Sequence, residues 1–140
     1  MPDTRPTFHQ QLDRVKTDVA RLAAMVTDVI PRGTHALLNA DLEGARGLIE
    51  HDDELDRLTL EIEEQCYALL VLQQPMATDL RVIVSALRMA SEIERSGDLV
   101  VNIAKTMRRI YGDELTPRIR GLIEQMSEEA AKLYKSAIDA

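Results

Sequence analysis

Long stretches of this chain repeat apolar residues in alternating steps of four and three, with only short breaks between them. The first stretch carries such a seam from its start: Phe8, Leu12, Val15, Val19, Leu22 and Val26. Steps of this size keep the side chains on one face of an α-helix, so the spacing predicts a long amphipathic helix. Long helices with short connections pack as antiparallel neighbours, and the sequence therefore predicts an all-α bundle.

Breaks in the apolar pattern place the second and third helices. Asp41 is the predicted N-cap of a helix that runs to about Leu72. Pro75 ends that helix, because the residue before a proline avoids helical backbone angles. Thr78 is the predicted cap of a third helix, which covers about 79–110. The second and third helices are thus expected to form a hairpin centred on Pro75.

Two other breaks concern the first and last helices. Pro31 and Gly33 interrupt the first seam, which predicts either a kink or a stop and restart of the helix. Gly112 and Pro117 mark a later break, after which a last helix is expected at about 118–140. A shift of 111 residues places part of the first seam on this helix, at Ile123, Met126, Ala130, Leu133 and Ala137. The heptad pattern alone produces part of the match, so a true repeat and a chance match both stay open.

If the repeat is real, the last helix opens a second bundle and carries an apolar face that needs a cover. Five residues make up this outer face: Ile119, Leu122, Ile123, Met126 and Leu133. We expect the face to be covered, either by the first bundle or by a second molecule.

The composition fits one folded domain with an aliphatic core, since apolar residues make up 45% of the 140-residue chain and aromatic residues 3%. The net charge of −7 argues against sequence-independent binding to nucleic acid, which needs a basic surface. Cys66 is the one cysteine, so no intramolecular disulfide forms, and we expect a cytoplasmic protein with Cys66 in its core. The N-terminal residues contain no apolar signal region, and no apolar run is long enough to span a bilayer.

Two pairs of carboxylates are predicted to converge. Asp52 and Asp56 share one face of the second helix, and Glu94 and Asp98 share one face of the third, where Glu94 occupies a seam position. The centre of each pair lies 21 residues from Pro75, so an antiparallel hairpin brings both pairs to the same height. Four carboxylates at one height repel one another, and hard ions such as iron(III), manganese, magnesium or calcium prefer such oxygen ligands. The alternative is a helical interaction bundle whose carboxylates are solvated and bind no metal.

Other metal and catalytic sites find little support. His9, His35 and His51 are scattered, and no Glu-x-x-His motif stands on a helix, which argues against a di-iron oxidase of the ferritin-like type. No nucleophile elbow, glycine-rich phosphate loop or paired-cysteine motif is present, so an enzyme ranks last.

Gly97 lies on the third seam. Glycine destabilises a helix interior by about 1 kcal/mol relative to alanine, so its presence there predicts the close approach of a neighbouring backbone.

A basic pattern also runs along the third helix. Its members recur every seven residues and are called the arginine strip here: Arg81, Arg88, Arg95, Asn102 and Arg109. The favoured interpretation is a solvated flank whose arginines pair with Glu or Asp. The alternative is a docking strip for an acidic partner surface.

Four motifs occur together between residues 49 and 105: D-x-x-x-D, L-Q-Q-P-x-A-x-D-L-R, E-R-x-G-D and N-I-A-K. With the start FHQQLDRV, they resemble the PhoU family of phosphate-signalling regulators. Ser96 departs from the family pattern, which usually has a larger apolar residue there. The resemblance implies a PhoU-like three-helix bundle at 1–111, followed by a linker and the first helix of an incomplete second repeat at 112–140.

The same resemblance implies a role and a ligand set. Family members act as non-enzymatic adaptors between the ATPase subunit of the phosphate transporter and a sensor histidine kinase, so the membrane is reached only through partners, and a homodimer is expected. Their D/E-x-x-x-D motifs bind metal clusters. By resemblance, Asp52, Asp56, Glu94 and Asp98 are ligand positions for ions of the iron, manganese or magnesium class, with Asp53 as an additional ligand.

Overall fold

The computed structural model describes residues 5–140, which form four helices and no strand. Their bounds are Arg5–Leu38 (α1), Leu42–Gln73 (α2), Ala77–Arg109 (α3) and Pro117–Asp139 (α4). The prediction of an all-α bundle is confirmed. Residues 1–4, part of the stretch expected to contain no signal region, lie outside the described residues. Within the described chain, no helix combines the length and the apolar character needed to cross a membrane.

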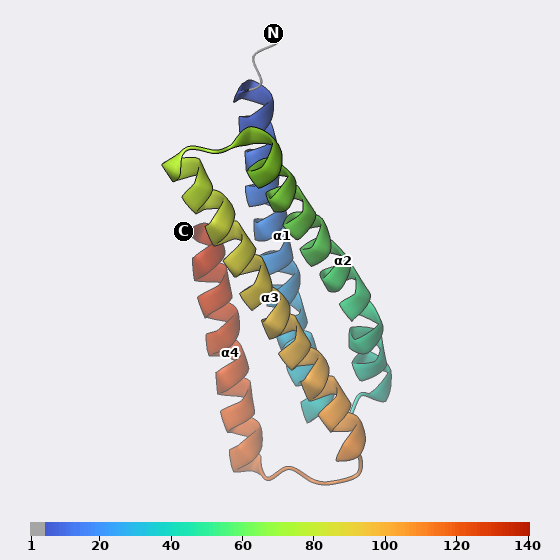
Figure 1. Ribbon diagram of the computed structural model, residues 1–140. Helices are drawn as coiled ribbons and strands as arrows, with labels where there is room; N and C mark the ends of the chain where they lie inside the picture. Colours follow the sequence, from blue (N-terminus) through green and yellow to red (C-terminus); the bar gives the residue numbers. More distant parts are fainter. Residues whose placement is uncertain (1–4) are drawn as a thin grey trace.

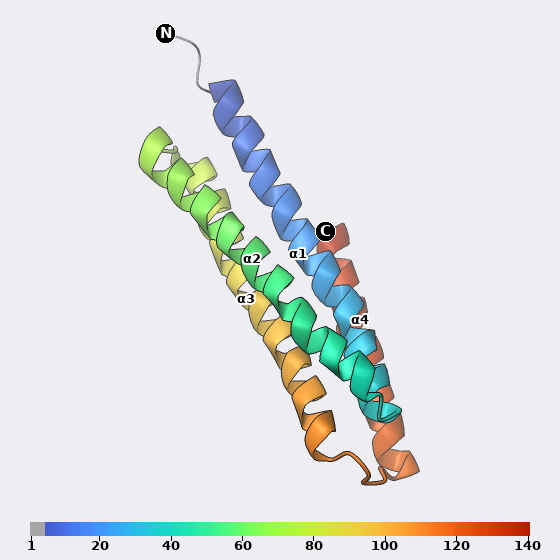
Figure 2. The ribbon, with the colours of Figure 1, turned by 90° about the vertical axis from the view of Figure 1, so that its right-hand side faces the viewer.

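Helices α1, α2 and α3 form a three-helix bundle, in which α2 and α3 make a hairpin and α1 packs against both (Figure 1, Figure 2). The predicted seams of α1 and α2 are buried along their whole length, which is why both helices are long and continuous. A second, smaller core cluster fills the end of the bundle away from the α2–α3 turn, from Val29, Ala36, Ala45, Leu48, Val100, Ala104 and Met107. Cys66 is fully buried, as expected for a core residue.

The caps at the two hairpin helices differ. Asp41 caps α2 as predicted, because its Oδ1 accepts a hydrogen bond of 2.9 Å from the backbone N–H of Gly44. The prediction for α3 is wrong. That helix begins at Ala77 after the extended residue Met76, without a side-chain cap, and Thr78 therefore lies inside its first turn. Helix α2 ends at Gln73, two residues before Pro75, as the proline predicted.

Helix α1 neither stops nor restarts at Pro31. It continues to Leu38 because its apolar face continues across the proline: Val29 before it and Ala36 after it both belong to the second core cluster. Gly33 is buried, and a Cβ atom built on it would lie 2.8 Å from Cγ1 of Val100. A glycine at this position therefore lets α3 approach α1 closely.

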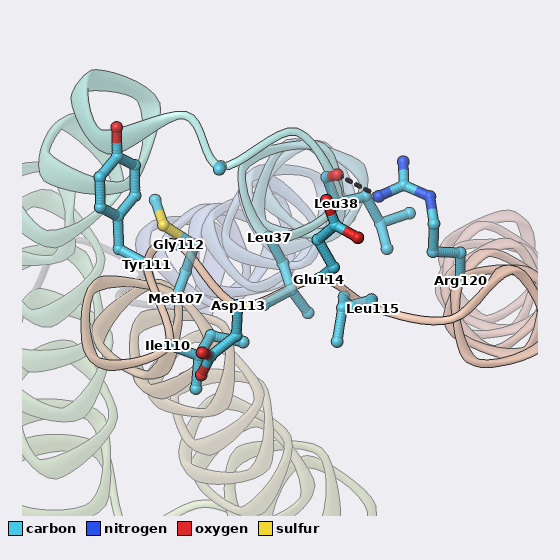
Figure 3. A pocket seen from close by; sticks show the side chains of 11 residues that line it. Leu37, Leu38, Met107, Ile110, Tyr111, Gly112, Asp113, Glu114, Leu115 and Arg120 are labelled. Atoms are coloured by element: carbon cyan, nitrogen blue, oxygen red, sulfur yellow. Dashed lines mark hydrogen bonds between the residues drawn. The ribbon is translucent and has the colours of Figure 1, made fainter.

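Helix α4 turns back from the end of α3 and packs along α1 (Figure 1). Its start is held by Arg120, whose guanidinium donates a hydrogen bond to the carbonyl oxygen of Leu38, beside a pocket of about 220 Å³ (Figure 3). Near its other end, Tyr134 and Ile138 pack against the main core, and the Tyr134 hydroxyl hydrogen-bonds to Oγ of Ser96 on α3.

The first bundle does not cover the outer face of α4. Met126 is 71% exposed and Leu133 is 70% exposed, while Ile119 and Leu122 are about half exposed. Only Ile123, among the residues of this face, is partly buried. The expectation of cover by the first bundle is therefore wrong, because α4 turns a different side toward α1. Cover by a second molecule stays a prediction, as does the division of the chain at residue 111.

Candidate metal centre

Three carboxylates from two helices converge on one flank of the bundle. One ligand atom each from Asp52, Asp56 and Asp98 lies within 4.8 Å of the others. Asp52 and Asp56 come from one face of α2, and Asp98 comes from α3 at the height set by the hairpin. We call these three residues the carboxylate cluster. Asp56 and Asp98 are exposed, whereas Asp52 is partly buried, so the cluster is open to solvent on one side.

Asp52 is the most constrained member of the cluster. Its Oδ1 atom is buried and accepts no hydrogen bond from any described residue. Burial raises the pKa of Asp52 above its ordinary value, and repulsion from Asp56, Asp98 and then Asp53 raises it further. Lys105 lowers the pKa of Asp52 by a smaller amount. A buried carboxylate oxygen without a donor is the kind of atom that a bound cation would satisfy.

Glu94 lies beside the cluster without being one of its three convergent residues. Burial raises the pKa of Glu94, and hydrogen bonding to the Asp56 carboxyl and repulsion from Asp56 and Asp98 add to the rise. Its seam position explains the partial burial, since the neighbouring seam residues Ala90 and Gly97 are buried. The structure therefore brings Glu94 next to Asp56 and leaves it a candidate for the edge of the site.

Asp53 and its acidic neighbours lie outside the cluster. Asp53 and Glu54 are exposed, and Nδ1 of His51 lies 3.4 Å from Oε2 of Glu54. Asp53 acts on the cluster only as a repelling charge on Asp52. Its predicted role as an additional ligand is untested.

Gly97 determines how closely the two helices approach at this height. It is buried, and a Cβ built on it would lie 3.0 Å from Cδ1 of Leu55 and 3.8 Å from Cγ2 of Val26. The close neighbour is thus a side chain, not the backbone that the sequence led us to expect. Since Leu55 precedes Asp56 and Gly97 precedes Asp98, this packing contact positions the carboxylates above it.

The donor set fits a hard cation. Its ligands are carboxylate oxygens alone, which suit magnesium, calcium, manganese or iron(III) better than zinc or copper. The raised pKa of Asp52 and the lack of a hydrogen-bond donor at its Oδ1 are expected where several carboxylates gather without a compensating positive charge. Exposed acidic groups also occur without a metal, so binding itself stays a prediction.

Lys105 was not identified from the sequence as a neighbour of the carboxylate cluster. It stands seven residues after Asp98, on the same edge of α3, and its charge acts on Asp52. The heptad relation to Asp98 was the signal that could have found it.

The arginine strip does not pair with acidic groups. Its four arginines and Asn102 are exposed, and none of the four lies within 4.0 Å of a carboxylate of the described chain. The favoured interpretation, a solvated flank that pairs with Glu or Asp, is therefore confirmed in its solvent exposure and wrong in its pairing.

Comparisons with known proteins agree on one family. The family model described as PhoU domain matches residues 19–107. The chain is 34% identical, over 134 residues, to "Phosphate-specific transport system accessory protein PhoU homolog 2" of Mycobacterium tuberculosis, covering 95% of this chain and 63% of that protein. It is 36% identical, over 96 residues, to the PhoU homolog of Aquifex aeolicus, covering 69% of this chain and 43% of that one.

A solved structure is similar over the same span. The phosphate transport system regulatory protein PhoU from Streptococcus pneumoniae superposes with a TM-score of 0.86 at 26% identity, covering 95% of this chain and 62% of that one. The chain thus spans less than two thirds of the length of these relatives.

Proposed function

Because the chain belongs to the PhoU family, we propose that it is a non-enzymatic regulator of phosphate uptake and phosphate-responsive signalling. The relatives carry names of accessory or regulatory proteins of the phosphate-specific transport system. By this proposal the protein works in the cytoplasm, as a homodimer, and links the transporter's ATPase subunit to a sensor histidine kinase. Family membership carries this part of the proposal.

We also propose that the carboxylate cluster is a metal site. The convergence of Asp52, Asp56 and Asp98 within 4.8 Å is the observation that carries it. These three residues would hold the cation, with Glu94 at the edge of the site. A bound cation would supply the positive charge that offsets the repulsion among the carboxylates, and so would join α2 to α3 at this height. The role of the protein's own residues is to hold these oxygens close together, through the contact of Gly97 with Leu55.

Metal analysis tests the site. Wild-type protein, equilibrated with manganese, magnesium or iron(III) and then separated from free ions, should retain metal. Asp56→Ala and Asp98→Ala should lose most of it. Glu64→Ala on α2 and Glu92→Ala on α3 remove exposed acids outside the cluster and should retain it. Zero metal in the wild type after supplementation would leave the alternative, an interaction bundle with solvated carboxylates.

Binding measurements test the adaptor role separately. The purified ATPase subunit of the phosphate transporter from the same organism should bind immobilised protein, and the cytoplasmic part of the sensor kinase should do so as well. If neither binds, with or without metal, the adaptor role is rejected while the metal site is unaffected.

A further inference from the structure

The arginine strip runs along the face of α3 that points away from the core. Helix α3 contacts α1 and α2 on its other side. At one end of the strip, Arg81 also lines a pocket with Tyr134 and Ile138 of α4. The four arginines are exposed, and together they form a basic surface on a protein whose net charge is −7. The strip borders the carboxylate cluster, since Asp98 stands three residues after Arg95 and four before Asn102, but none of its arginines belongs to the cluster or is used in the proposed function.

Other exposed arginines of the described chain, such as Arg14 and Arg21, also lie within 4.0 Å of no carboxylate, but the strip is distinguished by lining up four such arginines on one face of one helix. Arg32, Arg46 and Arg57, on α1 and α2, each lie within 4.0 Å of a carboxylate four residues away. On α3, Arg81 has no acidic residue three or four positions away, and Asp113, four positions after Arg109, lies beyond the end of the helix. Glu92 has that spacing to both Arg88 and Arg95, yet it lies within 4.0 Å of neither. Guanidinium groups left unpaired in this way are available to carboxylates of another molecule.

The spacing of the strip selects the shape of the partner. A repeat of seven residues rises about 10.5 Å along α3 and drifts by about 20° per repeat. The strip is therefore a gently left-handed line. A second helix with a seven-residue repeat follows such a line, because two helices of this kind coil around each other with left-handed twist.

Exposed apolar side chains lie beside the strip and could be buried against a partner. Leu99 is 55% exposed and Ile103 is 37% exposed, and they lie four and eight residues after Arg95. Exposed apolar groups next to unpaired arginines are typical of protein interfaces, where arginine is enriched. An anionic bilayer fits less well as the partner. Its broad negative surface repels the acidic molecule as a whole, which has a net charge of −7. A narrow helix interacts mainly with the charges that lie within a Debye length of about 8 Å, which here are the arginines of the strip.

We propose that the arginine strip, with Leu99 and Ile103 beside it, binds an acidic helix of a partner protein that presents a carboxylate every seven residues. The carboxylates pair with Arg81, Arg88, Arg95 and Arg109, and apolar residues of the partner helix cover Leu99 and Ile103. Asn102 takes the remaining position of the repeat with a neutral amide.

The test uses the full chain and a fluorescent synthetic helix of about four heptads, with glutamate at one position of each heptad and leucine beside it. A second peptide of the same composition distributes its glutamates around the helix. We expect the first peptide to bind at least about tenfold more tightly than the second, with affinity that falls as salt is added. Equal binding of the two peptides, or binding of neither at low salt, overturns the proposal.

Two matched variants locate the binding surface. The strip variant carries Arg81→Gln, Arg88→Gln and Arg95→Gln, and should bind the first peptide about tenfold more weakly. The control variant carries Arg14→Gln, Arg21→Gln and Arg118→Gln, which removes the same charge from exposed positions outside the strip, and should bind within about twofold of wild type. Circular dichroism verifies that both are folded. Equal losses in the two variants contradict the proposal, and so do phosphatidylserine vesicles that bind only through the strip and are not displaced by the peptide.

Discussion

Gly97 of α3 and Leu55 of α2 touch at the level of the carboxylate cluster, where an added Cβ would come within 3.0 Å of the Leu55 side chain. Leu55 is 2% exposed and has little room to move. The glycine therefore permits a separation of the two helices that any larger residue would increase, and the carboxylates that follow both residues depend on that separation.

Replacing glycine by alanine at two helical sites separates this packing effect from helix propensity. Gly47→Ala should stabilise the protein by about 0.5–1 kcal/mol, because nothing lies within 4 Å of the new methyl group. Gly97→Ala has the same propensity gain but overpacks the Leu55 contact, at a cost of about 1–3 kcal/mol. Urea unfolding of both variants measures the difference. Equal stabilisation of the two would show that α2 and α3 can separate freely.

The raised pKa of Asp52 predicts a pH-dependent cost in metal-free protein. A carboxyl group whose pKa is higher in the folded state binds its proton more tightly there, so its contribution to stability is present below the ordinary value of 3.8 and is lost as pH rises through the raised pKa. Asp52→Asn should therefore stabilise metal-free protein at neutral pH, by about 0.5 kcal/mol for the relieved repulsion with Asp56 alone. The gain should disappear in acid. Thermal unfolding at several pH values, with a chelator present, checks this.

A bound cation should reverse that behaviour. Protons and metal compete for the same carboxylates, so metal-loaded protein should gain stability as pH rises, where metal-free protein loses it. At a free ion concentration of about 100 times Kd, the gain is about 2.7 kcal/mol. Melting temperatures with manganese, and after addition of a chelator, measure this effect. Asp98→Ala should show little response to the ion, and an unchanged response in that variant would place the ion elsewhere.

Cys66 should be chemically inert in the folded protein. Burial, with a smaller effect of Glu63, raises the pKa of its thiol to about 11, so hardly any thiolate forms near pH 8. An aromatic disulfide reagent should react with Cys66 only after unfolding in urea. Rapid reaction in native buffer would show that α2 opens locally.

The outer face of α4 offers a test of its partner. Met126→Lys and Leu133→Lys should each change monomer stability by less than about 0.5 kcal/mol, because both side chains are about 70% exposed. If a second molecule covers this face, sedimentation should show association in wild type and its loss in these variants. A wild type that sediments as a strict monomer contradicts cover by a second molecule.

The sequence predicted the α2–α3 hairpin well because the cap and the proline that bound α2 act on the backbone next to them. Asp41 and Pro75 bound α2, and the equal chain distances from Pro75 brought Asp98 to the height of Asp52 and Asp56. The contact at Gly97 was predicted as a close approach, but its partner is the Leu55 side chain, which depends on the rotation of α2.

Other features depended on tertiary packing that periodicity does not describe. The continuation of α1 through Pro31 rests on contacts with α3 at Gly33 and Val100. Helix α4 has apolar residues on more than one side, and the sequence did not show that Tyr134 would pack inward while Met126 stayed exposed. The missing ion pairs of the arginine strip depend on side-chain placement and could not be predicted from spacing alone.

Ser96 and Asp98 stand two residues apart on α3 and face different neighbours. Ser96 hydrogen-bonds to Tyr134 of α4, while Asp98 belongs to the carboxylate cluster with α2. A helix behaves as a rigid rod over so short a distance, so any rotation of α3 that moves Asp98 also displaces Ser96. The position of the carboxylate cluster is thus coupled to the packing of α4. A change in the distance between α2 and α3 at Asp98 would lengthen or shorten the hydrogen bond between Ser96 and Tyr134 on the other side of α3.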